Sequence, residues 1–466
     1  MLATALTAGL AIHSGAANAA AAESKSTPPK LPSSPGIAKL SQWTLPAEDL
    51  YPYAIAAGPS AGPDQMWFTA GRGQPGLRAI EQKVEPVIGR ISFGGEIREF
   101  SPPNLSLVPT ANSITAGNDG AMWFLGQGSV GRITQDGQIT SFPVDTGLAG
   151  GGIASGSDGS LWFTKSDAVG HGAIVRMTLS GQATEFPLSE PGSAPGSIVP
   201  GPDGNLWFAE AGTERIGRIT PAGTITEFPI GSRPSDLVAG HDGNIWYATD
   251  GAIGRISAAG KVFSPIAVEG GFGPLAAGPD LRLWFGDARF PLALGRVTRD
   301  GRRSLTELPS GARWVVDLAT GTLGSLWYIA RAEGPCMGGG GSCQISRPSQ
   351  PGVIGLIQQS HPVVVIKRTG FSVHPRWARV RLACLGGEAL GRCRGEVTLE
   401  SRAGVRFGRK RFEVRTDTTK FVPLRLLREG REALLTGRRL RLVAHVDHPE
   451  GTPTSRGFVV PPKRAR

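Results

Sequence analysis

The sequence has almost none of the long amphipathic patterns that α-helices require. Across 466 residues, apolar side chains hardly ever recur at positions i, i+3, i+4 and i+7. The 67 Gly and 37 Pro instead suit short strands joined by tight turns. This length exceeds one compact core, so we expect several modules unless the fold is repetitive. The composition therefore predicts an all-β protein.

No segment of the sequence is a convincing transmembrane helix. Residues 1–19 contain no acid, Lys or Arg and end in Ala17-Asn18-Ala19, a small-x-small pattern typical of signal peptide cleavage. The basic n-region of a signal peptide is missing, so a disordered Ala-rich tail is the alternative interpretation. A membrane anchor is not expected, because the run is too weakly apolar. We predict a signal peptide at 1–19, a Ser/Pro/Lys-rich linker at 20–36 and a secreted, extracellular protein.

Cysteine is scarce, and its four residues form two local pairs, Cys336/Cys343 and Cys384/Cys393. Their short spacings in Gly-containing loops favour two disulfide-closed loops outside the cytoplasm, the second closing a hairpin. Free thiols are one alternative. A zinc site is another, but it requires the pairs to meet in space, and neither pair has the spacing of a zinc knuckle.

The sequence does contain a repeat. One unit, GPDGNLWFAEAGTERIGRITPAGTITEFPI, runs from Gly201 to Ile230, and variants of it recur along the chain. Units of about 40 residues are typical of four-stranded propeller blades. We therefore predict a seven-bladed β-propeller over residues 37–358. The seven anchoring Trp are Trp67, Trp123, Trp162, Trp207, Trp246, Trp284 and Trp327.

Each part of the unit has a structural interpretation. Asp203-Gly204 supplies the positive φ of a two-residue hairpin turn. The Leu-Trp-Phe segment is a strand that fills the space between blades, and Gly217 permits a close backbone approach. Residues 37–46 look like an outer strand without a blade. We predict that this strand pairs into the last blade and closes the propeller, which removes exposed sheet edges.

The motifs GPDGNLWF, IGRIT and GxITEFP resemble those of the streptogramin lyases, the virginiamycin B lyase family, over residues 37–358. Members that act as lyases open a cyclic depsipeptide antibiotic by elimination at its ester bond, with Mg²⁺. The resemblance implies a His base in a Pro-His-Gly-Ile type segment at the start of a blade. It also implies carboxylates that hold the cation.

The residues of this sequence match that site only in part. Glu210 corresponds to a metal-binding Glu, Asp287 holds the equivalent position two blades on, and Ala194 stands where a second carboxylate is implied. His171 and His241, the two His of the propeller, lie in a loop insertion and a turn. Mg²⁺ is thus the one cofactor that the resemblance suggests. No His occupies the blade starts, which are Tyr53, Asn112, Gly151, Gly196, Ser235, Gly273 and Val316.

A mixed-charge group is expected at one end of the propeller, near the central channel. We predict a small-molecule or peptide ligand there, and a solvated rim is the alternative. The repeated Arg of IGRIT are expected to pair across strands with acids such as Glu99, Glu185, Glu227 and Glu307. The ligand-binding candidates are Asn112, Lys165, Asp236, Asp250, Arg289, Asp317 and Arg331.

The repeat stops near His361, and the charge changes with it. Residues 361–466 contain 24 Lys and Arg against 9 Asp and Glu. Such a basic domain would attract anionic cell-envelope polymers, although an Arg-rich composition alone explains the same count. Nucleic acid is not expected, because aromatic stacking platforms are few. Short strands at 363–366, 378–383, 396–401, 411–415, 421–427 and 440–446 predict an Ig-like β-sandwich.

Two functions are compatible with these features. The missing His favours a non-catalytic ligand-binding or scaffold propeller, which we expect to be a monomer. The alternative is a Mg²⁺-dependent carbon–oxygen lyase with a diverged base, acting on a cyclic depsipeptide or a related lactone or ester.

Overall fold

A computed structural model describes most of residues 37–460. The predicted signal peptide (1–19), the linker (20–36) and the Cys336/Cys343 pair lie outside the described residues. The longer internal gaps are 60–64, 73–84, 103–113, 146–150, 287–292, 332–350, 367–371, 386–391 and 448–453, and each other gap spans four residues or fewer.

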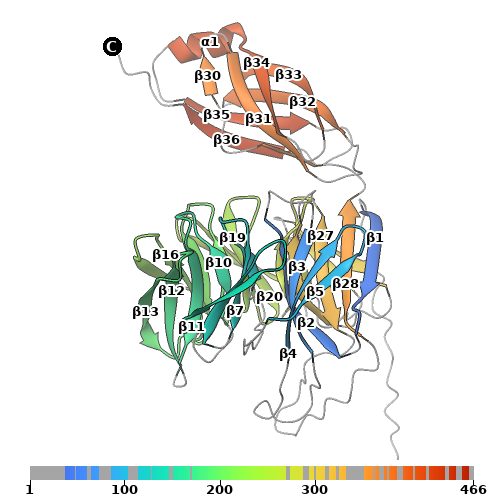
Figure 1. Ribbon diagram of the computed structural model, residues 1–466. Coiled ribbons are helices and arrows are strands. Elements are labelled where there is room, and N and C mark those ends of the chain that lie inside the picture. Colours follow the sequence, from blue (N-terminus) through green and yellow to red (C-terminus); the bar gives the residue numbers. More distant parts are fainter. Residues whose placement is uncertain are drawn as a thin grey trace, which may run out of the picture. The chain divides into compact units, whose positions relative to one another are not determined.

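Seven antiparallel sheets of four strands form the propeller (Figure 1). Blade 1 consists of β2 (Leu50–Ala57), β3 (Gln65–Arg72), β4 (Glu85–Ser92) and β5 (Ile97–Phe100). Blade 2 consists of β6 (Ile114–Ala116), β7 (Met122–Gly126), β8 (Ser129–Ile133) and β9 (Ile139–Pro143). Blade 3 consists of β10 (Ile153–Ser155), β11 (Leu161–Ser166), β12 (His171–Met177) and β13 (Ala183–Pro191). Blade 4 consists of β14 (Pro195–Pro200), β15 (Leu206–Glu210), β16 (Arg215–Ile219) and β17 (Ile225–Pro229). Blade 5 consists of β18 (Asp236–Ala239), β19 (Asn244–Thr249), β20 (Ala252–Ser257) and β21 (Val262–Ala267). Blade 6 consists of β22 (Leu275–Ala277), β23 (Leu283–Gly286), β24 (Ala293–Val297) and β25 (Arg303–Glu307). Blade 7 consists of β26 (Trp314–Thr320), β27 (Leu326–Arg331), β28 (Val353–Gln359) and β1 (Ile37–Thr44).

Strand β1 is the outer strand of blade 7, where it pairs with β28 (Figure 1). Its Trp43 stacks on Trp327 with ring centroids 5.7 Å apart. In four other blades an outer-strand Phe stacks on the blade Trp in the same way. A Cβ on Gly95, in the outer turn of blade 1, would overlap the Trp43 ring, so the two residues are in close contact. The N-terminal strand therefore completes blade 7 and also touches blade 1.

The hydrophobic core lies between neighbouring blades. Trp207 of blade 4 packs in one cluster with Leu237 and Ile245 of blade 5. Another cluster contains Phe68 of blade 1 and Ile329 of blade 7. Because the second strand of every blade buries its Trp and the following Phe or Tyr against neighbouring blades, the aromatic residues hold the blades together, as the repeat predicted.

The Gly of the IGRIT motif makes room for an aromatic ring. Gly217 lies opposite Phe208 in the pairing of β15 with β16, and a Cβ at this position would overlap the ring. The close approach that the sequence predicted is therefore between Gly and a side chain, not between two backbones. The same relation holds for Gly89/Phe68, Gly131/Phe124, Gly254/Tyr247, Gly295/Phe285 and Gly355/Tyr328.

The Gly-Pro-Asp-Gly turn differs from the predicted two-residue hairpin. The Gly201 N–H donates to the Asn205 carbonyl at 2.7 Å, and the Gly204 N–H donates to the Gly201 carbonyl at 3.2 Å. Three residues thus form the loop, and Gly204 adopts the expected positive φ of +83° at its end. A type I turn followed by a residue in the left-handed region is a common three-residue hairpin loop.

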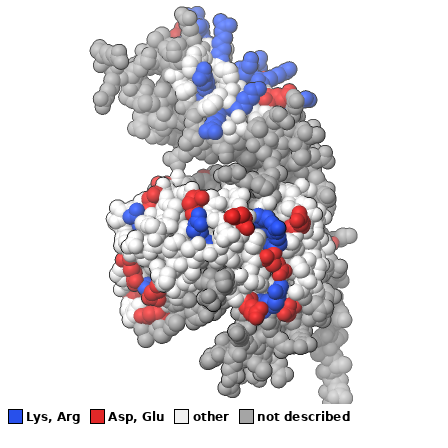
Figure 2. Space-filling view, viewed as in Figure 1, with Lys and Arg blue, Asp and Glu red and all other residues white. Residues whose placement is uncertain are grey.

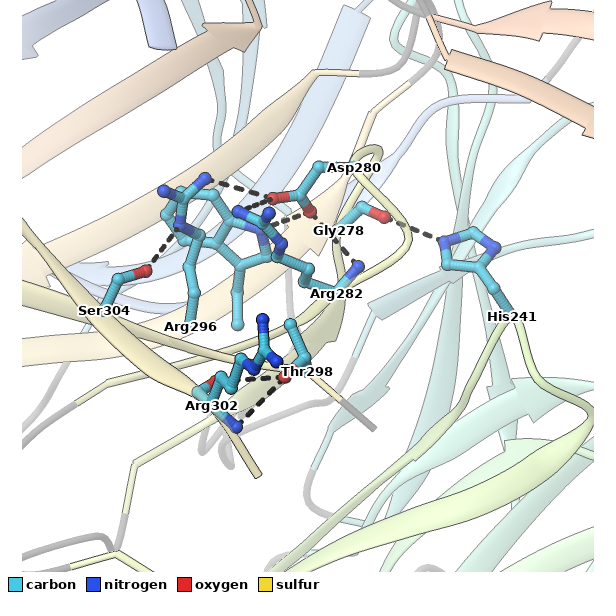
Figure 3. Close-up of polar contacts among 9 residues, drawn as sticks. His241, Gly278, Asp280, Arg282, Arg296, Thr298, Arg302 and Ser304 are labelled. Atoms are coloured by element: carbon cyan, nitrogen blue, oxygen red, sulfur yellow. Dashed lines mark hydrogen bonds and ion pairs between the residues drawn. The ribbon is translucent and has the colours of Figure 1, made fainter. Parts of the chain in front are cut away.

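In four blades the Asp of the corresponding turn contacts both the Trp and the Arg of its blade. In blade 6, Asp280 accepts from Trp284 Nε1 at 2.9 Å and from Arg296 Nη1 at 3.1 Å (Figure 3). The Arg296 guanidinium also lies 4.8 Å from the centroid of the Trp284 ring. The Asp–Arg pair recurs as Asp119/Arg132, Asp158/Arg176 and Asp242/Arg255.

The predicted partners of the repeated Arg are therefore wrong. Each of these Arg lies over the Trp of its own blade, and in four blades it pairs with the turn Asp. In blades 1 and 4, Arg90 and Arg218 instead donate to main-chain carbonyls of the next blade. The outer-strand acids Glu99, Glu185 and Glu227 pair with Arg72, Lys165 and Arg215.

The C-terminal residues form two sheets of four strands around one hydrophobic cluster that includes Ala378, Val397 and Leu442. All six predicted strands are present. Strands β30 and β36 and helix α1 (Arg428–Leu435) were not predicted. One sheet contains β29 (Val363–Ile366), β31 (Trp377–Leu385), β30 (Ser372–His374) and β34 (Thr419–Arg425), and the other β33 (Arg406–Arg415), β32 (Arg392–Ser401), β35 (Leu440–Asp447) and β36 (Thr454–Val460).

The predicted disulfide between Cys384 and Cys393 is present, and both residues are buried. It joins β31 of one sheet to β32 of the other, so it connects the two sheets and does not close a hairpin. The Ig-like topology stays a prediction. In the described part of the chain, no helix has the length and apolar character needed to span a membrane.

Candidate functional site

The start of the first strand and the end of the second lie at the same end of each blade, because the two strands are antiparallel. Pro195 is thus paired with Glu210, and Trp314 with Arg331. We call this end of the propeller the channel face. It carries the described members of the predicted set at the ends of the Trp-bearing strands, which are Lys165, Glu210, Asp250 and Arg331.

Glu210 is a buried carboxyl group at the channel face of blade 4, with no exposed surface. Its Oε2 accepts a hydrogen bond from Thr213 Oγ1 at 3.2 Å, and its Oε1 has no partner among the described residues. Burial, with a smaller contribution from the charge of Glu227, raises the pKa of Glu210 to about 7. The carboxyl group therefore holds its proton up to near neutral pH.

The loop that enters blade 4 lies against Glu210. The Gly212 N–H donates to the Ser193 carbonyl at 3.0 Å, which brings this loop to the turn that follows Glu210. The buried Ser193 hydroxyl, like Glu210 Oε1, lacks a partner within the described ranges. A Cβ on Gly196 would meet no described atom within 4 Å. Two unsatisfied polar groups thus lie near a position with space for a side chain or a ligand.

Asp236 and Asp317, both predicted to bind ligand, are buried and bonded to neighbouring blades. Asp236 accepts from Ser197 Oγ of blade 4 at 2.7 Å and from the Leu275 N–H of blade 6 at 2.8 Å. Asp317 accepts from the Ile55 N–H of blade 1 at 2.8 Å. Burial raises the pKa of both carboxyls. These contacts give both residues a structural role between blades; ligand binding by them stays a prediction.

Lys165 and Arg331 also have partners in the protein. Lys165 Nζ lies 2.8 Å from Asp145 and 2.6 Å from Glu185. Arg331 donates from Nη2 to the Pro52 carbonyl at 2.8 Å, and its guanidinium lies 4.9 Å from the centroid of the Tyr53 ring. Burial lowers the pKa of Arg331. Both cations therefore stabilise contacts at the channel face itself.

The other candidates are less informative. Asp250 is exposed, in the turn between β19 and β20. Asn112, Arg289 and Asp287 lie outside the described residues.

The model of the virginiamycin B lyase family matches residues 36–230 and 148–338 of this chain. The chain belongs to this family. The match spans the propeller repeats, so the family motifs and the seven sheets identify the same part of the molecule. No curated protein matches the chain.

Solved structures of lyases resemble this family member across the propeller. A structure described as a streptogramin B lyase is 25% identical, with a TM-score of 0.54, and covers 69% of this chain and 97% of its own. A catalytically inactive His-to-Ala variant of the virginiamycin B lyase from Staphylococcus aureus, solved with quinupristin, is also 25% identical. Its TM-score is 0.52, with coverage of 68% and 99%.

The Mg²⁺ site implied for the lyase family does not fit the residues described here. These residues include no group of three His, Cys, Asp or Glu placed to hold a metal ion. Ala194 stands where the second carboxylate is implied, and Glu210 is protonated at moderately acidic pH. Because Mg²⁺ requires several oxygen ligands in octahedral geometry, Glu210 does not form a site on its own. The other predicted ligand, Asp287, falls in one of the gaps.

Two of the blade starts have no room for the His side chain that the lyase family implies at such a position. A Cβ on Gly151 or Gly273 would overlap the carbonyl oxygen of Thr164 or Gly286, so neither position accepts a side chain. One His pair was missed from the sequence: His171 Nδ1 lies 2.9 Å from Asp167 Oδ2 across an exposed turn. The Asp-x-x-x-His spacing could have revealed it, whereas nothing in the sequence marked Ser193.

We expect Glu210→Gln to stabilise the protein at pH 8 by roughly 2 kcal/mol and to have little effect at pH 4.5. Glu210 has a higher pKa in the folded chain than its ordinary 4.5, so its stabilising contribution is complete below about pH 4.5 and is lost as the pH rises through about 7. The neutral amide avoids this loss. Urea unfolding at the two pH values measures it, with the exposed Glu307→Gln as control. An effect that is equal at both pH values would contradict the prediction.

Proposed function

We propose that the propeller of this virginiamycin B lyase family member binds a ligand at its channel face and does not catalyse the lyase reaction. The observation that carries this proposal is the absence of His from all seven blade starts. Elimination requires a base that removes the α-proton of the substrate, and His is suited to this near neutral pH. The inactive His-to-Ala variant of the Staphylococcus aureus lyase is consistent with such a requirement.

Glu210 is a poor substitute for that base. Its pKa of about 7 suits proton transfer, but the residue has no exposed surface through which a substrate could reach it. A base must come within hydrogen-bond distance of the proton that it removes. The alternative function, a Mg²⁺-dependent carbon–oxygen lyase, keeps support from family membership and from the position of Glu210. It requires the blade 4 loop to move away.

The polar groups of blade 4 suggest what the ligand offers. Glu210 Oε1 is an acceptor when ionised and Ser193 Oγ both donates and accepts, and both lack partners among the described residues. Gly196 leaves room next to Pro195, the residue paired with Glu210. Both atoms are buried, so a small molecule or peptide with hydrogen-bond donors would satisfy them once the blade 4 loop moves away. We therefore favour a polar ligand at blade 4.

Incubation of the full chain with Mg²⁺ and quinupristin tests the proposal. Elimination converts the cyclic ester into a linear isomer of the same mass, so the two are separated by chromatography. We expect no linear product, while the Staphylococcus aureus lyase serves as positive control. Ring opening that disappears in Glu210→Ala, but not in the exposed Glu307→Ala, would overturn the non-catalytic assignment.

We further propose that the protein is secreted and that its basic C-terminal domain attaches it to anionic polymers of the cell envelope. Export is supported by the small-x-small site that ends at Ala19, and attachment by the excess of 24 basic over 9 acidic residues at 361–466. An exported chain whose sequence does not begin at Ala20 would contradict the cleavage site.

A further inference from the structure

A groove of about 610 Å³ lies on the C-terminal domain. Residues of both sheets line it, and four of them are basic. None of the described lining residues is acidic. The lining consists of Trp377, Arg379, Arg409, Lys410, Pro423, Leu424 and Arg425.

Paired strands build one wall of this groove. Trp377 of β31 lies opposite Arg425 of β34, and Arg379 lies opposite Pro423. Burial alternates along both strands, which places these side chains on the outer face of the sheet. The next pair on that face, Arg381 opposite Phe421, continues the alternation of basic and apolar residues beyond the groove.

Strand β33 adds Arg409 and Lys410 from the other sheet, and both are exposed. Arg409 forms a long ion pair, with its Nη1 4.0 Å from Glu396. Figure 2 shows Lys and Arg side chains gathered over the visible face of this domain, with few acids between them. The groove therefore keeps a strong positive potential. Other described acids of the domain pair with Arg outside the groove, as in Glu413/Arg394, Glu400/Arg406 and Glu432/Arg428.

The aromatic rings of this face are already in contact with Arg. The Arg379 guanidinium lies 4.6 Å from the centroid of the Trp377 ring, and that of Arg381 lies 5.7 Å from Phe421. Nucleic-acid bases need open aromatic faces for stacking, so this arrangement suits charged groups better than bases. Stacking also holds the guanidinium planes in place, which favours paired hydrogen bonds to carboxylates.

We propose that this groove binds an acidic polysaccharide through its uronate carboxylates. The proposal rests on the attachment of the C-terminal domain to anionic polymers and assigns that role to one site. Arg379 and Arg425 hold successive carboxylates, Lys410 and Arg409 contribute from the opposite sheet, and the apolar ring of Pro423 contacts the sugars. The sugar hydroxyls remain in water, as suits a groove open to solvent.

The test is the binding of the full chain to polygalacturonate at about 50 mM salt, where ionic contacts are strong. The groove variant is Arg379→Gln/Arg425→Gln. The control, Arg394→Gln/Arg431→Gln, removes the same charge from exposed positions outside the groove. We expect the groove variant to bind about tenfold more weakly and the control to stay within about twofold of the wild type. Both should keep the thermal midpoint of the wild type.

Each other outcome counts against a specific statement. If the wild-type chain does not bind polygalacturonate, both the attachment and the groove assignment fail. If it binds but both variants lose the same affinity, attachment stands and the groove is overturned. Neutral dextran that binds as tightly, or a single-stranded oligonucleotide that displaces the polysaccharide and depends on the same two Arg, would overturn the proposed occupant.

Discussion

Replacing Asp280 by Asn is expected to destabilise the protein by about 3 kcal/mol, because it removes the negative charge beside a buried cation. The side chain of Arg296 is 1% exposed and lies 3.1 Å from Asp280. Burial lowers the pKa of Arg296, and Asp280 offsets part of that effect. Asn keeps an oxygen that accepts from the indole N–H of Trp284, so the loss of stability reports the effect of the missing charge alone. Arg282, 3.8 Å from Asp280, would then repel Arg296 (Figure 3).

Asp203→Asn in blade 4 is the matched control for this effect. Asp203 accepts from Trp207 Nε1 at 3.1 Å, as Asp280 does from its own Trp. The blade Arg, Arg218, donates instead to the Ala258 carbonyl of the next blade. The control should therefore cost less than about 1 kcal/mol. Urea unfolding at low and high salt measures both variants. Equal losses, or a loss at Asp280 that high salt abolishes, would contradict a buried pair.

Much of the fold was predictable because similar segments recur along the seven blades. A Trp-Phe strand, an IGRIT strand and an outer strand with Phe recur together. An outer strand that belongs to no blade precedes the first unit, and pairing it into the last blade completes the propeller. The partner of each repeated Arg was not predictable in the same way. All six of these Arg lie over a Trp ring, yet four pair with the turn Asp while Arg90 and Arg218 donate to carbonyls of the next blade, a difference that the shared motif does not encode.

The candidate site was only partly predictable, for a related reason. The family motif located Glu210, but its burial depends on the loop before blade 4, which no local pattern describes. Asp236 and Asp317 were predicted as ligand residues because they lie in the innermost strands. A sequence does not distinguish a carboxylate that faces the channel from one whose oxygens accept N–H groups of adjacent blades.

Gly217→Ala is expected to destabilise the protein by about 3 kcal/mol, because the new methyl group would occupy the space of the Phe208 ring. Phe208 is fully buried and packs with Ile174 of blade 3 and Leu206 of its own blade, so the ring cannot move without disturbing both. In blade 3 the residue opposite Phe163 is Val175, and that ring therefore cannot lie over it as Phe208 lies over Gly217. In the Gly217→Ala variant, the Phe208 ring would likewise have to move away from its place over residue 217.

Gly196→Ala provides the comparison within the same blade. Gly196 lies in β14, has no positive φ, and its new methyl group would meet none of the described atoms within 4 Å. Both substitutions reduce the freedom of the unfolded chain equally, which favours folding by about 0.5 kcal/mol. Gly196→Ala should thus be neutral or slightly stabilising. The difference in unfolding free energy between the two variants then measures the overlap with the ring alone. A difference below about 1 kcal/mol would show that the Phe208 ring moves easily, and that the Gly of each IGRIT motif is not needed for packing.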